Sequence, residues 1–416
     1  MNKLAVVKST KAAKTTSTSK AFQVLDSFAG AGGFSLGFQM AGGTIAGAIE
    51  IDRFASETFK ANHPESTVFT GDLGSLSAKR IECLFSKQSP DVILGGPPCQ
   101  GYSICNKNAG DPKDPKNSLF REFVRLGEIF SPRLMIMENV PNLQRAMTES
   151  KIPVLEIIRS ELSRLGYHVY DKVLQASHYG VPQIRRRLFV IASKQALEHP
   201  FPEPTHTDQA EDGENWFLNG LKSCPTLWDA ISDLPSLEAC EGTEVQPYTE
   251  KAKNDYQRLM RAGSTEVYNH AAMNHTPRMV ERFSVMNWGD SSSDVPEHLR
   301  PYARSSGGVI SKKSYDQNNR RMHPDRPCHT IAASFYANFV HPFKHRNFTA
   351  REGARIQSFP DWFRFSGKPT LVSTKLLERE GRADEIGLCQ YNQIGNAVPP
   401  LLAAAVANHL IKLQVI

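Results

Sequence analysis

The sequence predicts an α/β fold with a mostly parallel sheet, joined to a second, smaller domain of irregular structure. Short apolar segments alternate with amphipathic segments from about residue 22 to residue 193. Such alternation is typical of parallel sheets whose connecting helices cover both faces. The alternation stops near Lys194, and 416 residues are more than one typical core needs. We therefore expect two domains.

The expected strands are short apolar runs rich in Val, Ile and Leu. They span residues 22–25, 45–49, 67–70, 92–94, 134–137, 169–175 and 188–192. Segments with apolar residues at helical spacing lie between or after them. These expected helices span residues 34–39, 54–62, 119–130, 154–165 and 401–413. The last of them is long and apolar enough to pack back against the first domain.

We divide the chain into four parts. Residues 1–20 form a leader that is rich in Ser, Thr, Ala and Lys and has no acidic residue, a composition typical of disordered segments. Residues 21–199 form the expected α/β domain. Residues 200–340 begin with a polar, Pro-containing stretch and lack regular alternation, so they form the smaller domain. Residues 341–416 are expected to return to the α/β domain.

Composition and charge narrow the class of protein only a little. The net charge of +6 includes five lysines of the leader, so it is a weak indication of nucleic-acid binding. No apolar stretch approaches the roughly 18 residues that span a bilayer, and no signal-peptide pattern is present. The seven cysteines are scattered, without a CxxC pair. They argue against a disulfide framework or structural zinc, and they favour a reducing cytoplasm.

The segment Val24–Phe34 has the pattern of a strand, a glycine loop and the start of a helix. Ser35 stands where the dinucleotide fingerprint has its third glycine, and no Gly-Lys-Ser/Thr follows, so the loop suits a ligand without a pyrophosphate. Glu50 ends the next strand, where a carboxylate can accept both ribose hydroxyls, although a surface acid is an equal alternative. Asp72 follows the third strand and could accept from an adenine amine. Together these residues predict S-adenosylmethionine.

Cys99 follows the strand 92–94 on the stiff loop Gly95-Gly96-Pro97-Pro98. The two prolines fix φ and remove two backbone donors, so this loop neither continues the sheet nor starts an ordinary helix. A lone cysteine is most often a small buried hydrophobe. The polar neighbours Gln100 and Ser103 argue against that reading here. Cys99 is therefore our candidate nucleophile.

Polar residues also stand at two other strand ends. Glu138 ends the strand 134–137, and a carboxylate in a partly dry cleft is expected to have a raised pKa. A purely structural role is the alternative for this glutamate. Arg185, Arg186 and Arg187 precede the strand 188–192, and alternation puts the first and third on one face. They form either a solvated basic patch or a clamp for an anion or a carbonyl oxygen.

In this order, the segments resemble the DNA (cytosine-5) methyltransferase family of bacterial type. Pro-Pro-Cys-Gln at 97–100 and Glu-Asn-Val at 138–140 are the most specific of them. The resemblance covers most of the chain, in Phe28-Ala29-Gly30, Glu50, Asp72, 97–100, 117–120, 138–140, 183–187, 326–331, 349–352, 357–360 and 393–400. There are two mild departures. Cys328-His329 replaces smaller residues, and Ile51 stands where an aromatic residue is often seen beside the adenine.

The resemblance implies a Rossmann-like, S-adenosylmethionine-dependent methyltransferase domain and a target-recognition domain over 200–340. The implied reaction is methylation of C5 of a flipped-out cytosine within a specific double-stranded DNA sequence, which releases S-adenosyl-L-homocysteine. Cys99 would attack C6 of the base, protonated Glu138 would donate to N3, and Arg187 would contact O2 with Arg185 in support. A thiolate at Cys99 requires a lowered pKa. No metal is implied.

The resemblance also implies two sets of binding residues. The expected cofactor-binding residues are Phe28, Ala29, Gly30, Gly32, Gly33, Glu50, Ile51, Asp72, Leu73, Gly96, Pro98, Leu119, Asn396 and Val398. The expected substrate-binding residues are Gln100, Ser103, Asn139 and Gln183.

We expect a cytoplasmic, nucleoid-associated monomer whose partner is double-stranded DNA. A cognate restriction endonuclease is a second partner if the enzyme belongs to a restriction–modification system. A tRNA cytosine-5 methyltransferase is the main alternative, but the long region between Arg187 and Thr330 favours DNA. Intact Cys99 and Glu138 argue against a catalytically inactive homologue. The broken glycine fingerprint argues against an NAD-dependent oxidoreductase.

Overall fold

The computed structural model describes residues 22–85, 89–98, 119–148, 151–208, 220–303, 308–311, 316, 318–370 and 372–416. The leader at 1–20 lies outside the described residues. The same is true of Cys99, Gln100 and Ser103.

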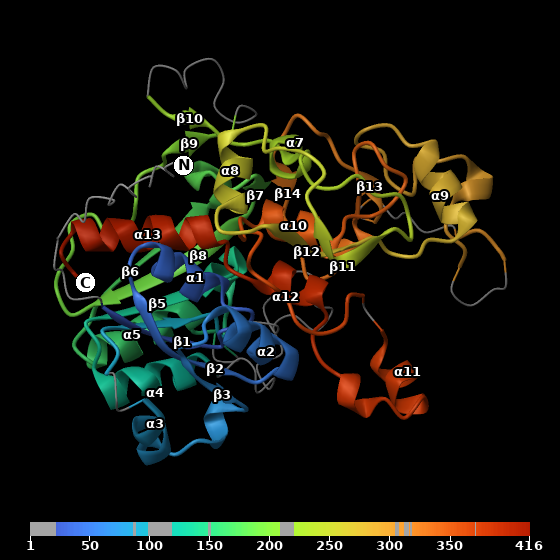
Figure 1. The fold of residues 1–416 in the computed structure, drawn as a ribbon. Coiled ribbons are helices and arrows are strands. Elements are labelled where there is room, and N and C mark those ends of the chain that lie inside the picture. The colour runs from blue at the N-terminus through green and yellow to red at the C-terminus, as the bar shows by residue number, and fades with distance from the viewer. Residues whose placement is uncertain are drawn as a thin grey trace, which may run out of the picture.

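A seven-stranded sheet forms the centre of the larger part of the molecule (Figure 1), in the order β3-β2-β1-β4-β5-β8-β6. Its strands are β1 Gln23–Ser27, β2 Thr44–Glu50, β3 Thr67–Thr70, β4 Val92–Gly95, β5 Leu134–Asn139, β6 His168–Gln175 and β8 Arg186–Ser193. The first five run parallel, whereas β8 is antiparallel to both β5 and β6. The predicted α/β fold with a mostly parallel sheet is confirmed, with β8 as its reversed strand.

Alternate strand residues enter two hydrophobic cores, one on each face of the sheet. Val24 of β1 lies in a core with Phe38, whereas the next residue, Leu25, lies in a second core with Phe123. The helices around the sheet are α1 Gly33–Met40, α2 Arg53–Asn62, α3 Ala78–Phe85, α4 Phe120–Phe130, α5 Val154–Arg164 and α13 Pro400–Lys412. All of them except α3 were predicted. That helix has only Ile81 and Phe85 buried, so its sequence pattern is weak.

The last helix, α13, lies across α1, which brings the two ends of the described chain together (Figure 1). Gly37 makes this close crossing possible. A Cβ at this position would lie 2.3 Å from Cβ of Ala403 and 2.6 Å from the carbonyl oxygen of Pro400. No real pair of carbon atoms packs at such a distance, so a side chain here would push the helices apart.

Replacement of Gly37 by alanine is therefore expected to lower the free energy of unfolding by about 1–3 kcal/mol. Chemical denaturation of the purified variant measures this change. Met40→Ala is the matched control, because Met40 is on the same helix and is exposed. If both variants unfold at the wild-type denaturant concentration, α1 and α13 do not pack as closely as described.

The rest of the chain forms a second part with short helices and two-stranded sheets (Figure 1). Its helices are α7 Leu227–Ile231, α8 Asp255–Arg261, α9 Pro277–Ser284, α10 Ala350–Ile356, α11 Thr374–Arg379 and α12 Gln390–Asn396. The short strands are β7 Gln183–Ile184, β9 His206–Thr207, β10 Lys222–Ser223, β11 Gly242–Pro247, β12 Glu266–Ala271, β13 Arg320–Arg321, β14 Cys328–His329 and β15 Phe339–Val340. The irregular architecture that we expected beyond residue 200 is present.

One hydrophobic core crosses the boundary that we expected between residues 340 and 341. It contains Leu227 and Val267 from one side of this boundary, and Phe348 and Tyr391 from the other. Leu36 of α1 belongs to the same core. A smaller cluster around Phe283 of α9 is separate from it. The chain after residue 341 thus packs on the α/β domain and on the irregular part at once.

Within the described residues, no single helix is long and apolar enough to cross a membrane. The pair 383–396 and 400–412 passes that test only when its two members are taken together, and it is bent by 57° between them. Most of α13 is buried in the core beneath α1.

Candidate active site

The glycine loop follows β1 and carries three residues with positive φ, namely Phe28 at 56°, Gly30 at 55° and Gly32 at 95°. Gly32 is the N-cap of α1, where it has no side chain to bond the free helix amides. Asp26 takes over this task, because its carboxylate accepts a hydrogen bond of 2.6 Å from Oγ of Ser35 and another from the Ser35 amide. The serine that breaks the dinucleotide fingerprint thus anchors the helix to β1.

Complete burial raises the pKa of Asp26 from 3.8 to about 7, and its hydrogen bonds to Ser35 oppose this rise. Between these two pH values the unfolded chain releases the proton and the folded chain keeps it. The free energy of unfolding should therefore fall as pH rises from about 4 to about 7, by up to about 1.4 kcal/mol per pH unit.

Asp26→Asn removes the titrating group, so the contribution of this group is the difference between the pH profiles of wild type and variant. Urea denaturation at intervals of half a pH unit measures both profiles. Two parallel profiles between pH 4 and pH 7 would contradict a buried, protonated Asp26.

Glu50 links the end of β2 to the glycine loop. Its Oε2 accepts from the Gly30 amide at 2.7 Å, and its Oε1 accepts from the Asp52 amide at 2.8 Å. Burial raises the pKa of this carboxyl, and the amide hydrogen bonds oppose the rise. A carboxylate has about four lone-pair sites, and those that the backbone amides leave free can accept from a ribose hydroxyl. Next to it, Ile51 is 69% exposed and presents an apolar surface.

Asp72 lies at the end of the neighbouring strand β3, and its Oδ1 accepts from the Gly74 amide at 2.9 Å. This bond starts the one-turn helix η1, Leu73–Ser75, whose first residue is buried. The C-terminal segment closes the other side of the glycine loop, because a Cβ on Gly33 would lie 2.4 Å from the carbonyl oxygen of Val398. Asn396, two residues earlier, is the exposed last residue of α12.

Asn139 holds the loop that leads to Cys99. Its Nδ2 donates a buried hydrogen bond of 3.0 Å to the carbonyl oxygen of Pro97. Glu138 lies beside the same loop, because a Cβ on Gly96 would be 3.7 Å from its Oε2. The described part of this loop, which precedes the candidate nucleophile, is thus anchored by Asn139 and has the carboxyl group of Glu138 next to it. We expected Asn139 to bind substrate, and here its amide anchors this loop.

Glu138 and Arg187 form a buried ion pair at the carboxyl end of β5. Nε of Arg187 is 2.9 Å from Oε1 of Glu138, and the two side chains are only 15% and 11% exposed. Burial raises the pKa of Glu138, and the charges of Arg187 and Arg185 limit the rise. The ion pair holds one carboxyl oxygen, so the other, Oε2, lies toward the Gly96 side. A carboxyl group with a raised pKa in this position can donate a proton to a ligand.

Arg185 lies on the same side as Arg187, as alternation predicted, while Arg186 is exposed. The described hydrogen bonds of Arg185 all go to backbone carbonyls. Its Nη1 donates to Ile331 at 2.6 Å, and its Nη2 donates to Gly395 at 3.0 Å and to Ala397 at 3.1 Å. Burial lowers its pKa. Arg185 therefore ties the C-terminal segment to the site and affects Glu138 through its charge.

Gln183, which we expected to bind substrate, has partners within the protein. It is fully buried, its Oε1 accepts from the Ile331 amide at 2.8 Å, and its Nε2 donates to Oε1 of Gln357 at 2.7 Å. The cause is the pairing of β7 with β14, which encloses this side chain between two segments. The structure thus shows Gln183 connecting the segments around Ile331 and Gln357.

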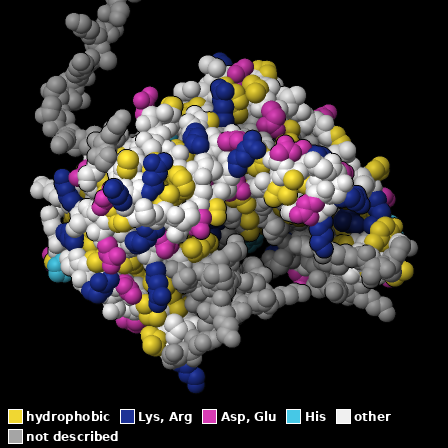
Figure 2. All heavy atoms as spheres, turned by 90° about the horizontal axis from the view of Figure 1, so that it is seen from below, with side chains coloured by type: hydrophobic (Ala, Val, Ile, Leu, Met, Phe, Trp, Pro, Cys, Tyr) yellow, Lys and Arg dark blue, Asp and Glu magenta, His cyan; other side chains and the backbone are white. Residues whose placement is uncertain are grey.

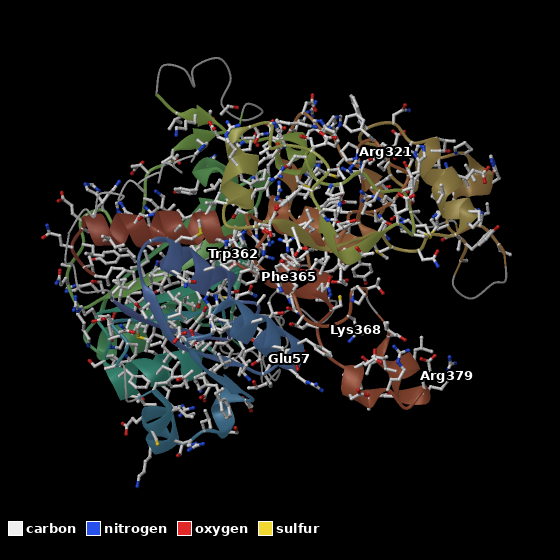
Figure 3. The ribbon with its side chains drawn as sticks, in the orientation of Figure 1. Glu57, Arg321, Trp362, Phe365, Lys368 and Arg379 are labelled. Carbon is white, nitrogen blue, oxygen red and sulfur yellow. The ribbon has the colours of Figure 1, made fainter. Side chains whose placement is uncertain are left out.

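A hydrogen-bonded connection between α2 and the C-terminal segment had not been found in the sequence. Oγ1 of Thr58 donates to Oε1 of Gln393 at 2.6 Å and accepts from the Ser366 amide at 2.8 Å. The stretch with Trp362, Phe365 and Lys368 runs from the junction of the two parts past α2 toward α11 and Arg379, while Glu57 points outward from α2 (Figure 3). Thr58 and Gln393 are 335 residues apart in sequence, so no local pattern could reveal this connection.

A family model described as C-5 cytosine-specific DNA methylase matches residues 22–412. The chain belongs to this family. It is 46% identical over 387 residues to the Type II methyltransferase M.DdeI of Desulfomicrobium norvegicum, over 93% of this chain and 88% of that protein. It is also 35% identical to the Type II methyltransferase M1.HphI of Haemophilus parahaemolyticus, over 94% of this chain and 87% of the relative. The resemblance inferred from the motifs is confirmed.

Solved structures agree with this assignment. A putative DNA modification methyltransferase encoded within a prophage of E. coli matches with a TM-score of 0.70 at 25% identity, over 95% of this chain and 99% of the other. The S. pombe Dnmt2 methyltransferase, at 16% identity, shares the fold with a TM-score of 0.56 over 94% of this chain and 99% of its own. The chain is thus an enzyme of C5 cytosine methylation in DNA. Among its described residues, no group of three or more His, Cys, Asp or Glu could hold a metal ion.

Proposed function

We propose that this DNA (cytosine-5) methyltransferase modifies a flipped-out cytosine in a specific duplex sequence through a covalent bond to Cys99. The observation that carries this proposal is the buried Glu138–Arg187 pair beside the loop that leads to Cys99. A carboxyl group with a raised pKa can donate to N3 of the base while charge builds up on the ring. Since a stacked base cannot reach such a site, the cytosine has to leave the helix.

The carboxyl ends of β1, β2 and β3 form the proposed site for S-adenosyl-L-methionine, which supplies an electrophilic methyl group when bound. The open glycine loop fits such a ligand, because a Cβ on Gly30 would meet nothing within 4 Å. Glu50 would hold the ribose hydroxyls and Asp72 the adenine amine, with Ile51 and Leu73 on the faces of the ring. The same site would be completed by Phe28, Ala29, Gly32, Gly33, Gly96, Pro98, Leu119, Asn396 and Val398.

The proposed reaction starts when the Cys99 thiolate adds to C6 of the cytosine, with Glu138 donating to N3. The electron pair of the C5–C6 double bond then makes C5 nucleophilic. C5 forms its bond to the methyl carbon, whose bond to sulfur breaks and leaves S-adenosyl-L-homocysteine. Loss of the C5 proton to a base restores the double bond and expels Cys99. Arg187 orients Glu138 and lies within reach of the O2 side, and Arg185 supports both.

Residues 200–340 are proposed to contact DNA and to read the bases around the target, with Gln100 and Ser103 contributing at the catalytic loop. On the face in Figure 2, basic side chains are intermixed with acidic ones. We further propose a monomer in the bacterial cytoplasm, at the nucleoid, whose cognate restriction endonuclease cuts the same sequence. The RNA alternative is not retained, because the family description names DNA.

Bisulfite sequencing of DNA from cells that express the chain tests this function directly. We expect protected cytosines within one short sequence motif, and none in cells with an empty vector. In a parallel assay, labelled S-adenosylmethionine should transfer its methyl group to duplex DNA and not to tRNA. Transfer to tRNA alone, or protection that follows no motif, would contradict the proposal.

A further inference from the structure

The helix α4 lies between the two halves of the proposed site. It begins at Phe120, directly after the undescribed segment that contains Cys99. Its residue Phe123 packs on the strand that leads into that segment, since a Cβ on Gly95 would lie only 2.6 Å from a carbon of the Phe123 ring. α4 is therefore fixed relative to the start of the Cys99 loop.

Arg125 connects the same helix to the adenine side of the proposed site. Its Nη1 donates to the carbonyl oxygen of Leu76 at 3.0 Å, and its Nη2 donates to that of Leu73 at 2.9 Å. Its Nε donates to Oε2 of Glu122, one turn earlier on α4, at 2.9 Å. These two carbonyls belong to the first residue of η1 and to the residue that ends it.

The turn η1 is thus held at both ends. Asp72 bonds the Gly74 amide, and the guanidinium of Arg125 bonds the carbonyl of the first residue, Leu73, and that of the C-cap, Leu76. A one-turn helix has little stability of its own, because few of its backbone groups have partners within the turn. Arginine suits this position because its planar group reaches two acceptors at once, whereas a lysine reaches them from a single nitrogen.

We propose that Arg125 is a positioning residue, which sets the adenine side of the donor site at a fixed place relative to the Cys99 loop. The inference rests on the proposed function, in which Asp72 and Leu73 bind the adenine. Loss of Arg125 would loosen η1 while Glu138 and the thiol remain unchanged. The defect should therefore appear in donor binding, with little change of the chemical step at saturating donor.

The test compares Arg125→Met and Arg125→Lys with wild type in two measurements. Calorimetry gives the Kd of S-adenosylhomocysteine, and steady-state kinetics gives KM for the donor and kcat on duplex DNA. We expect Arg125→Met to raise the Kd of S-adenosylhomocysteine about tenfold and the KM for the donor by a similar factor. The kcat should change less than about threefold. Arg125→Lys should lie in between. Methylthioadenosine is an adenosine thioether without the amino-acid part. The affinity of Arg125→Met for this compound should fall by the same factor.

Arg164→Gln is the matched control. Arg164 is an exposed residue of α5, and it pairs at 2.7 Å with Glu128 of α4, the helix that carries Arg125. It should leave both constants within about twofold of wild type. If Arg125→Met does not fold, Arg125→Lys decides the question alone. Wild-type affinity in a folded variant would overturn this inference only. Failure of the wild-type enzyme to bind S-adenosylhomocysteine would overturn the donor site, and this inference with it.

Discussion

Cys99→Ala is expected to abolish methyl transfer, with a loss on the order of 10⁴-fold or more, because the proposed mechanism assigns the bond to C6 to this thiol. Affinity for S-adenosylhomocysteine should be nearly unchanged, since the proposed donor site lies on β1, β2 and β3. Folding should also be preserved, as the substitution removes a single sulfur atom and adds no bulk. Transfer of a labelled methyl group to a cognate duplex measures the loss.

A trapping experiment separates the nucleophile from a structural cysteine. A duplex with 5-fluorocytosine at the target position cannot lose a proton from C5, so the wild-type enzyme should remain covalently attached to it. Cys99→Ala should form no adduct, whereas the control Cys240→Ala, at an exposed cysteine, should form it like wild type. Turnover retained by Cys99→Ala, or an adduct at another residue, would remove Cys99 from the mechanism.

Glu138→Gln is expected to slow methyl transfer by about a hundredfold or more, because an amide keeps the shape of the side chain but cannot deliver a proton. Binding of DNA and of S-adenosylhomocysteine should largely remain. Single-turnover kinetics on the cognate duplex isolates the chemical step. Equal losses of rate and of DNA affinity would assign Glu138 a structural role.

The pH dependence provides a second readout for the same residue. Since burial raises the pKa of Glu138, its protonated form persists to a higher pH than that of an ordinary glutamate. The wild-type rate should fall as pH rises through this pKa, once Glu138 ionises, and Glu138→Gln should lack that decrease. The control Glu57→Gln, at an exposed glutamate of α2 that pairs with Arg53, should keep the wild-type profile. Glu138→Gln also leaves Arg187 buried without a charged partner. The thermal stability of Glu138→Gln is therefore measured together with its rate.

Local pattern was enough to predict the sheet. The central strands are short runs whose residues are buried on both faces of the sheet, as in Val92–Gly95, and this burial makes such a run apolar throughout. The edge strands β3 and β6 are only partly buried. The helix α3 escaped prediction because only Ile81 and Phe85 of it are buried. The reversed direction of β8 was also absent from the pattern, because an apolar run reads the same in both orientations.

In the candidate site, too, local pattern predicted some features, and others depend on distant segments. Glu138 and Asp72 stand at strand ends, and strand ends of a parallel sheet lie at one edge, so the sequence could bring them together. Arg185 and Gln183 looked equally like ligand-binding residues. The structure turns both toward the backbone of segments about 146 to 212 residues later in the chain. Which neighbour a side chain meets across such a separation depends on how distant segments pack.

The amino-acid sequence by itself determined the family, most strands and helices of the α/β domain, and the candidate residues for the chemistry, because hydrophobic pattern and motif spacing are local properties. The tertiary structure alone decided which polar atoms are already occupied. It directs Asn139 to Pro97, Arg185 to the C-terminal carbonyls and Arg125 to η1. Buried hydrogen-bonding groups must find partners, and those partners are set by contacts between segments that the chain order keeps far apart.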